Sequence, residues 1–334
     1  MTKPVYSFII PVYNRPQEIR ELLGSMLELD GEFNYEVVIV EDGSQETSKG
    51  IVEEFRGKID INYHPKENTG PGHSRNVGMS IAQADYFIIL DSDVLLPPNY
   101  LNVVDEFLSQ HDVDCYGGPD AAHESFSPTQ KAIDYVMTSW LTTGGIRGKK
   151  GTLSYEPRSF NMGLSKKAFE ATGGFGSIHP GEDPDLSIRL KKQGFTIGLI
   201  TSAFVFHKRR ISWDKFFIQV SKFGRVRPIL NSWHPKHTKL TFWFPTFFCI
   251  GFIISLVTLA WGNYLLVLCY ASYVLAIFID ATRRYQSGKI GLMAVKAMCY
   301  QFFGYGKAFL ESTIRIGWLK LDPKKEYPEL FFDR

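Results

Sequence analysis

Residues 86–93 read YFIILDSD: five apolar residues followed directly by two aspartates, one residue apart. An apolar run of this length, without alternation, is typical of a strand buried on both faces of a parallel sheet. Ligands of such sheets bind beyond the carboxyl ends of the strands. The stretch therefore predicts a buried strand at Tyr86–Leu90, with Asp91 and Asp93 at the edge where a ligand binds.

Predicted strands and helices alternate along the N-terminal part of the chain. Apolar, β-branched runs predict the strands, and leucines at helical spacing or helix-start signals predict the helices. The strands are expected at Val5–Pro11, Tyr35–Val40 and Asp60–His64, and the helices at Arg15–Leu29, Thr47–Phe55 and Gly70–Ala84. This alternation predicts a mostly parallel α/β sheet, so Asp42, after the second strand, is expected at the same edge as Asp91.

The chain becomes strongly apolar after residue 212. Leu240–Trp261 is uncharged and long enough to cross a bilayer, which takes about 20 residues. A second uncharged run follows a tight turn, so we predict a two-helix transmembrane hairpin at 240–282. In 213–239, phenylalanines alternate with lysines and arginines, which predicts an interfacial amphipathic helix and a linker. An ordinary surface helix is the alternative for this segment.

Flanking charges predict the orientation of the hairpin. Positive residues lie outside both runs, whereas the turn between the runs carries none; they are Lys236, Lys239, Arg283, Arg284 and Lys289. By the positive-inside rule both ends are cytosolic, and the N-terminus lacks the apolar core of a signal peptide. We expect a multi-pass protein of the inner (cytoplasmic) membrane. Residues 1–212 would form a cytosolic catalytic domain, and 283–334 a membrane-surface helix and an exposed cytosolic tail.

The overall charge argues against one class of partner. The formal net charge is +2 for 334 residues, of which 22% are charged. A protein that binds nucleic acid through phosphates normally presents a basic patch or stripe. Nucleic acid is therefore not an expected partner.

The two aspartates after the buried strand predict a metal site. Carboxylates one residue apart can jointly hold a hard divalent cation, which in turn neutralises a diphosphate. Asp-x-Asp is also common at polar strand ends that bind no metal. The position after a buried strand and the other motifs of the chain therefore decide whether this pair is a metal site.

Several further motifs follow in order along residues 5–210. They are Phe8–Arg15 (FIIPVYNR), Val40–Ser44 (VEDGS), Asn68–Gly72 with Arg75 and Asn76, Asp91–Asp93, Asn161–Gly163, Gly173–Phe175 and Gly181–Asp183. In order and spacing the set resembles glycosyltransferase family 2, inverting enzymes with the GT-A fold. The resemblance implies a GT-A (Rossmann-like) domain that binds a nucleotide-sugar, with a UDP-sugar favoured, and a divalent metal, Mn²⁺ or Mg²⁺.

The resemblance also implies a donor site. Pro11, Val12 and Tyr13 would flank the base, and Asp42 would accept a hydrogen bond from the base or ribose; a turn aspartate is the alternative. Glycines at a helix start allow close approach of a nucleotide. Arg75 would reach a phosphate or else pair on the surface. The other residues implied in donor binding are Gly70, Gly72, Asp91, Ser92, Asn161 and Gly163.

The remaining implied roles concern the metal and the base. Asp93 would be the direct metal ligand, with Asp91 beside it and His207 completing the site, although a histidine after a strand is otherwise structural. Asp183 would deprotonate the acceptor hydroxyl as it attacks the anomeric carbon. Glu182 would orient the acceptor or the loop. The alternative for these two acids is a helix start with its N-cap.

The departures from the family pattern limit the function. Processive cellulose and hyaluronan synthases carry Gln-x-x-Arg-Trp before their pore helices, whereas Gln219–Phe223 lacks Arg and Trp at those positions. We therefore expect transfer of one sugar to a hydroxyl of a lipid-linked or envelope glycan acceptor, with membrane lipids as partners and Tyr135–Lys150 as an acceptor lid. The alternatives are a polyprenyl-phosphate sugar synthase and an inactive nucleotide-sugar-binding scaffold in an envelope assembly.

Overall fold

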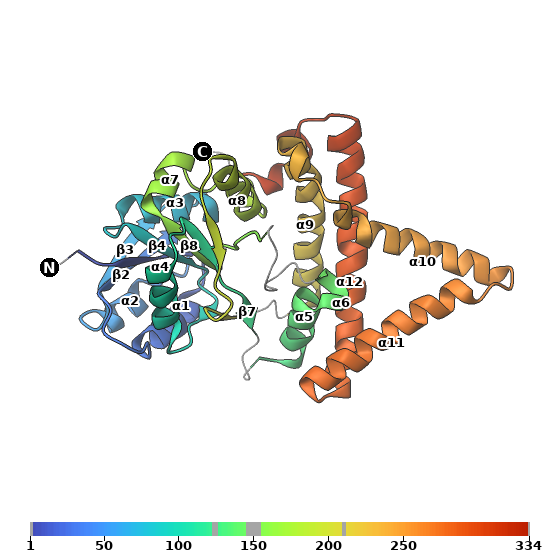
Figure 1. The fold of residues 1–334 in the computed structure, drawn as a ribbon, viewed down its shortest axis with the longest axis horizontal. Helices are drawn as coiled ribbons and strands as arrows, with labels where there is room; N and C mark the ends of the chain where they lie inside the picture. Colours follow the sequence, from blue (N-terminus) through green and yellow to red (C-terminus); the bar gives the residue numbers. More distant parts are fainter. Residues whose placement is uncertain (1–2, 122–125, 145–154, 209–211, 333–334) are drawn as a thin grey trace. The chain divides into compact units, whose positions relative to one another are not determined.

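The computed structural model describes residues 3–121, 126–144, 155–208 and 212–332. The chain forms two compact units, drawn in Figure 1, and each is described by itself. The first comprises Met1–His123, Gly148–Lys208 and Phe331–Arg334, and the second comprises Glu124–Arg147 and Arg209–Leu330. This division differs from the predicted boundary at residue 212, because a segment of the N-terminal half joins the second unit and the last residues return to the first.

The first unit is built on a mostly parallel sheet, as predicted. Among the described residues its strands run in the order β3-β2-β1-β4-β8-β6-β9. Their bounds are β1 Tyr6–Val12, β2 Tyr35–Asp42, β3 Ile61–Lys66, β4 Tyr86–Leu90, β6 Cys115–Gly117, β8 Asn161–Ser165 and β9 Ile197–Leu199. Strands β1 to β4 are parallel to one another, whereas β8 runs antiparallel to its neighbours β4 and β6.

Helices cover both faces of this sheet. Side chains alternate along a strand, so Phe8 and Ile10 pack with α1, α2 and α4, whereas Ile9 packs with α3, α7 and α8. The helices are α1 Pro16–Leu27, α2 Lys49–Phe55, α3 Pro71–Ile81, α4 Tyr100–Gln110, α7 Lys166–Thr172 and α8 Glu182–Lys192. Every residue of β1 is buried, which explains why its sequence is apolar without alternation.

A second, small sheet brings together distant parts of the first unit. Its order is β5-β10-β7, with β5 at Val94–Leu95, β7 at Asp120–Ala121 and β10 at Val205–His207. His207 on β10 pairs with Val94 on β5. This register places His207 beside Asp93, the residue that precedes Val94.

The second unit is helical, and α12 lies at its centre. Helix α12 packs against α9, α10, α11 and α5. The α-helices are α5 Pro128–Thr138, α6 Trp140–Thr143, α9 Trp213–Trp233, α10 Phe244–Ala260, α11 Leu265–Tyr285, α12 Gly288–Ser312 and α13 Pro323–Glu326; 3₁₀ helices lie at Pro235–His237, Leu240–Trp243 and Pro328–Leu330, and a π-helix lies at Thr313–Trp318. Phe216 and Val220 of α9 are buried in a core shared with α12. Protein therefore covers much of the face of α9 that was expected to meet a membrane, and the interfacial role stays a prediction.

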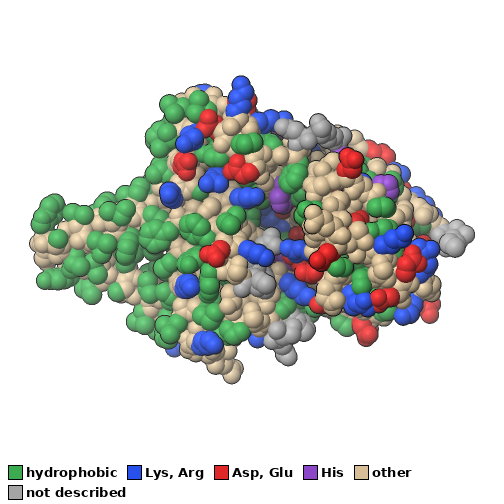
Figure 2. Space-filling model, turned by 180° about the vertical axis from the view of Figure 1, so that it is seen from behind, with side chains coloured by type: hydrophobic (Ala, Val, Ile, Leu, Met, Phe, Trp, Pro, Cys, Tyr) green, Lys and Arg blue, Asp and Glu red, His purple; other side chains and the backbone are tan. Residues whose placement is uncertain are grey.

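Two helices of the second unit are long and apolar enough to cross a membrane. Leu240–Ala260 and Leu265–Tyr285 each have 21 residues and a mean hydropathy of 2.0, and 11% of the most apolar window of each is buried. Figure 2 shows their hydrophobic side chains gathered over the hairpin. Such exposure is unusual for the core helices of a globular domain.

The C-terminal tail, expected to be exposed, is exposed only in part. Leu330 is fully buried and Tyr327 is 4% exposed, and Phe331 forms an antiparallel bridge with Ile178. The segment after Asp322 contains apolar side chains among its charges, and these are the ones that pack.

The segment Tyr135–Lys150, predicted to be an acceptor lid, is packed against other helices in the part that the structure describes. Tyr135 is fully buried in α5, and its hydroxyl lies 2.6 Å from the Asp280 carboxylate of α11. The hydroxyl of Tyr273 donates to the carbonyl of Leu141 at 2.7 Å. This part of the segment is therefore packed helix, and residues 145–150 lie outside the described residues.

Candidate active site

The carboxyl ends of β1, β2 and β4 lie at one edge of the main sheet, because these strands are parallel. Val12 pairs with Glu41, so Tyr13 and Asp42 leave their strands side by side. Pro11 and Val12 are buried, whereas Tyr13 is 50% exposed. Of these three residues, Tyr13 alone has an exposed side chain, and the contact of any of them with a base stays a prediction.

Asp42 organises the loop that begins α3. Its buried carboxylate accepts hydrogen bonds from the amides of Thr69 at 2.9 Å and Gly70 at 3.0 Å, and it pairs with Lys66. The loop turns at Gly70, where φ is +86° and the ring of Phe332 lies so close that a Cβ would be 2.3 Å from it. The predicted contact of Asp42 with a base or ribose stays a prediction.

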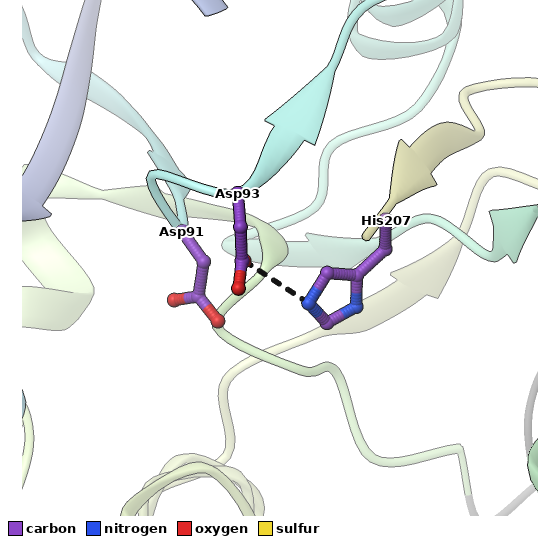
Figure 3. Close-up of side chains that lie close together, drawn as sticks. All are labelled: Asp91, Asp93 and His207. Atoms are coloured by element: carbon purple, nitrogen blue, oxygen red, sulfur yellow. Dashed lines mark ion pairs between the residues drawn. The ribbon is translucent and has the colours of Figure 1, made fainter. Parts of the chain in front are cut away.

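Three predicted metal ligands come together in Figure 3. Asp91 and Asp93 follow β4, and His207 ends β10. The Nε2 atom of His207 lies 3.2 Å from Oδ1 of Asp93. One ligand atom from each of the three residues lies within 4.8 Å of the other two.

Charged neighbours keep Asp93 ionised. Burial alone would raise the pKa of Asp93, but His207 and Arg15 lower it below its ordinary value. The Arg15 guanidinium pairs with the second carboxylate oxygen, and Nδ1 of His207 lies 3.8 Å from Oδ2 of Asp120. The carboxylate is therefore in the form that a cation requires.

These donors fit a divalent cation. Carboxylate oxygens suit Mg²⁺ and Mn²⁺, and an imidazole nitrogen favours a transition-metal ion over Mg²⁺. Asp91 and Asp93 would supply the oxygens and His207 the nitrogen. Because all three side chains are partly buried, a cation here would be shielded from bulk water on the protein side.

Arg75 joins the metal site to the second acidic pair. It is 3% exposed; Nη2 lies 2.7 Å from Oδ1 of Asp91, and Nη1 lies 3.0 Å from Oε1 of Glu182. The guanidinium also lies 5.2 Å from the centre of the Phe175 ring. The sequence predicted that Arg75 would either contact a phosphate or form an ion pair on the surface, and it did not predict a buried ion pair. The contact with a phosphate stays a prediction.

Glu182 and Asp183 begin α8 and differ sharply in environment. Burial would raise the pKa of Glu182, but His179 and Arg75 lower it to about 2. Burial and the Glu182 charge raise the pKa of Asp183 to about 6. Oδ1 of Asp183 is buried and accepts no hydrogen bond from the described residues. Asp183 is thus the acid suited to take up a proton near neutral pH, and Glu182 is the fixed negative charge beside it.

Asn161 and Gly163 have packing roles in β8. Asn161 is fully buried; its Nδ2 donates to the Ala203 carbonyl at 2.8 Å, and its Oδ1 accepts from the Tyr100 hydroxyl at 2.6 Å. A Cβ on Gly163 would lie 2.0 Å from the Tyr116 ring. Packing accounts for both residue types, and their role in donor binding stays a prediction.

Ser92 and Gly72 complete the predicted set. Ser92 is 6% exposed and lies between the two metal-site aspartates. A Cβ on Gly72 would lie 2.8 Å from the carbonyl oxygen of Gly176. Glycine therefore lets α3 approach the 175–179 loop, which leads into α8.

Sequence reasoning missed four residues that touch the site: Arg15, Asp120, His179 and Phe332. Arg15 closes the Phe8–Arg15 motif, so its position was available as a signal. His179 lies three residues before Glu182 and contacts it, but nothing in the local pattern distinguishes it from a loop histidine. Asp120 and Phe332 reach the site through pairings distant in sequence.

Comparison with known proteins decides the family. Residues 7–172 match the family model described as glycosyl transferase family 2. The chain belongs to glycosyl transferase family 2. The resemblance seen in the motifs is confirmed, and with it the assignment of the chain as a glycosyltransferase.

Curated relatives of this family 2 member include two bacterial enzymes. The poly(ribitol-phosphate) β-N-acetylglucosaminyltransferase TarS of Staphylococcus aureus is 33% identical over 112 residues, which cover 33% of this chain and 20% of TarS. The chondroitin synthase of Escherichia coli is 26% identical over 235 residues, covering 60% of this chain and 34% of the synthase. The matches thus span at most about a third of either relative.

Solved structures similar to this chain include that of a mannosyltransferase. The mannosyltransferase PcManGT from Pyrobaculum calidifontis, in complex with GDP-Man and Mn²⁺, superimposes with a TM-score of 0.56 and 16% identity, covering 96% of this chain and 89% of its own. At this identity the likeness establishes the fold, and the prediction of a GT-A domain followed by C-terminal helices is confirmed.

Proposed function

We propose that this enzyme transfers one sugar from a metal-bound nucleotide-sugar to a hydroxyl of a lipid-linked or envelope glycan acceptor, with inversion at the anomeric carbon. The observation that carries the proposal is the pairing of two acidic centres through one buried arginine. Asp91 of the metal site and Glu182 of the base site both bond Arg75. A transferase that acts on a metal-held diphosphate and an acceptor hydroxyl needs both centres within reach of one donor.

The first centre would hold the leaving group. Asp91, Asp93 and His207 would bind Mn²⁺ or Mg²⁺, and the bound cation would neutralise charge on the departing nucleoside diphosphate. The nitrogen ligand makes Mn²⁺ the preferred ion. Tyr13 and Asp42, at the ends of β1 and β2, would bind the nucleoside. A UDP-sugar is our preferred donor, and a GDP-sugar is tested beside it.

The second centre would activate the acceptor. Asp183 would accept the hydroxyl proton as the oxygen attacks the sugar, which is the one proton transfer that an inverting displacement requires. Its raised pKa, about 6, makes it a stronger base than an ordinary aspartate while leaving it mostly ionised at pH 7. Glu182 would stay ionised and hold the start of α8 in place.

The apolar hairpin would anchor the enzyme in the inner membrane, with the catalytic domain in the cytosol. A helix of 21 residues is about 30 Å long, which matches the hydrocarbon core of a bilayer. Trp261 is 81% exposed and Tyr264 is 62% exposed, next to the turn that joins the helices. Trp and Tyr are enriched at membrane–water interfaces. Membrane attachment would bring the enzyme to a lipid-linked acceptor.

The test is Asp183→Asn in the purified, detergent-solubilised full chain, with Asp112→Asn at an exposed loop position as the matched control. Nucleotide release from the best donor of a UDP-, GDP- and dTDP-sugar panel is followed from pH 5 to 8.5 with Mn²⁺. We expect wild-type turnover to rise with pH through about 6 and then level off. Asp183→Asn should lower turnover about 10²–10⁴-fold and abolish this rise, with donor affinity nearly unchanged.

Normal turnover of Asp183→Asn would contradict the role of Asp183 as base. If that turnover then needed a phosphate acceptor, the enzyme would instead be a polyprenyl-phosphate sugar synthase, since a bare phosphate requires little base assistance.

A further inference from the structure

The last described residues, Phe331 and Phe332, belong to the first unit and lie close to the loop before Glu182 and Asp183, the base site. Phe331 pairs with Ile178 in an antiparallel bridge, and the Phe332 amide donates to the Ser177 carbonyl at 2.9 Å. The loop that these backbone contacts hold continues directly into His179 and the start of α8. A C-terminal segment is thus hydrogen-bonded to the loop that leads into Glu182 and Asp183 at the start of α8.

The Phe332 side chain lies against Gly70 and beside His179. Its ring lies over Gly70, where a Cβ would be 2.3 Å from the ring carbon, and its centre is 6.1 Å from that of the His179 ring. Phe332 and His179 both line a pocket of about 310 Å³, together with residues of α3 and of the 175–178 loop. The Phe332 ring is therefore a direct neighbour of the His179 imidazole.

The His179 imidazole in turn bonds the fixed acid of the pair. Its Nδ1 lies 2.8 Å from Oε1 of Glu182, the same oxygen that Arg75 approaches at 3.0 Å. The Glu182 side chain is 4% exposed, whereas that of His179 is 40% exposed. A buried carboxylate requires partners of this kind, and His179, the more exposed of the two partners, is the one that lies next to Phe332.

We propose that His179 and Phe332 are positioning residues for the catalytic acids: Phe332 holds the His179 imidazole against Glu182, and His179 fixes Glu182 and hence the start of α8 that carries Asp183. The proposal deepens the proposed function, because it rests on Asp183 acting as the base. Neither residue needs to touch substrate. The C-terminal segment would then complete the base site from a point far away in the sequence.

The charges around Asp183 determine what loss of this contact does. Glu182 and Asp91 raise the pKa of Asp183, whereas Arg75 and Arg158 lower it. Burial lowers the pKa of His179, but the nearby Glu182 outweighs this and raises it, so the imidazole is cationic around pH 6. Removing a cation stabilises the protonated form of Asp183, so the pH at which the enzyme becomes active should move upward.

The first experiment compares His179→Leu, His179→Gln, Phe332→Ala and Phe332→Leu with the wild type, with His111→Gln at an exposed position as the control. Nucleotide release by the full chain with Mn²⁺ and its best donor gives kcat and KM from pH 5 to 8.5. We expect His179→Leu to move the rise in kcat upward by about half a pH unit or more. Phe332→Ala should move it the same way by less, Phe332→Leu should restore it, and donor KM should change little in the His179 variants.

A second experiment needs no turnover. The titration of the His179 ring is followed by NMR of the full chain with labelled histidine, and the His179→Gln spectrum identifies the signal. We expect a His179 pKa above 6.5 in the wild type, and a fall toward 6.5 in Phe332→Ala. An unchanged titration in Phe332→Ala, or an unmoved kcat profile in His179→Leu, would overturn the proposal. Failure of the proposed function shows separately, as normal turnover of Asp183→Asn with the His179–Phe332 contact still visible by NMR.

Discussion

Replacing Arg75 by methionine should destabilise the first unit strongly. Methionine keeps most of the side-chain volume but leaves Asp91 and Glu182 without the cation that both contact at 2.7 and 3.0 Å. Removing one partner of a buried ion pair costs about 3–5 kcal/mol. Glu182 is buried, but the Asp91 side chain is 31% exposed, so water screens its share and the lower end of the range applies.

The expected loss of unfolding free energy can be measured as a fall in the melting temperature, Tm. In a domain of 150–250 residues, 1 kcal/mol shifts Tm by about 2–4 °C, so about 3 kcal/mol corresponds to about 6–12 °C. Intrinsic fluorescence of the detergent-solubilised full chain, without donor or metal, measures the shift. Arg75→Lys should lose less, because it keeps the charge although one ammonium cannot reproduce the two-sided contact.

Arg56→Met is the matched control. Arg56 pairs with Glu53 at 2.8 Å, but its side chain is 71% exposed, so its loss should leave Tm within about 1–2 °C. If Arg75→Met has the same Tm as this control, Arg75 does not stabilise the two acidic centres. The inference that Arg75 links Asp91 to Glu182 would then be wrong.

Two further predictions concern the metal and the membrane. Asp93→Asn should weaken Mn²⁺ binding, measured by calorimetry without donor, at least about tenfold, because it removes the ionised ligand next to His207; wild-type affinity in this variant would exclude Asp93 as a ligand. Ile253→Arg, at a position of α10 that is 60% exposed, should raise the apparent insertion free energy of that helix by about 2.5–3.5 kcal/mol. A glycosylation-reporter insertion assay with Ile253→Leu as control measures this, and equal insertion of the two variants would show that α10 does not cross the bilayer.

The sequence predicted those parts of the fold that local pattern determines. Tyr86–Leu90 is a strand with the predicted bounds, because an apolar run between polar residues has one stable place in a covered sheet. The position of Asp91 and Asp93 directly after β4 followed from the same pattern. His207 required the family resemblance, since its meeting with Asp93 depends on the register of β10 against β5.

The contacts that the sequence did not predict join segments far apart in the chain. Asn161 matches a family motif, yet its side-chain amide is buried and bonds Tyr100 and Ala203. The end of α5 fell within the predicted acceptor lid, and nothing in the local sequence shows that α5 packs on α12. Phe332 lies near the charged C-terminal end of the sequence. Its place over Gly70 depends on the pairing of Phe331 with Ile178, which the local sequence pattern does not predict.

Donor hydrolysis by the wild type and by the Asp91→Asn/Asp93→Asn double variant tests the central claim most directly. Both full-length proteins are given UDP-, GDP- and dTDP-sugars with Mn²⁺, with Mg²⁺ or with EDTA, and released nucleotide is measured. We predict slow release from one donor by the wild type, fastest with Mn²⁺, absent with EDTA and lost in the double variant. Release that continues in EDTA, or at the wild-type rate in the double variant, would contradict a metal-dependent sugar transfer at this site.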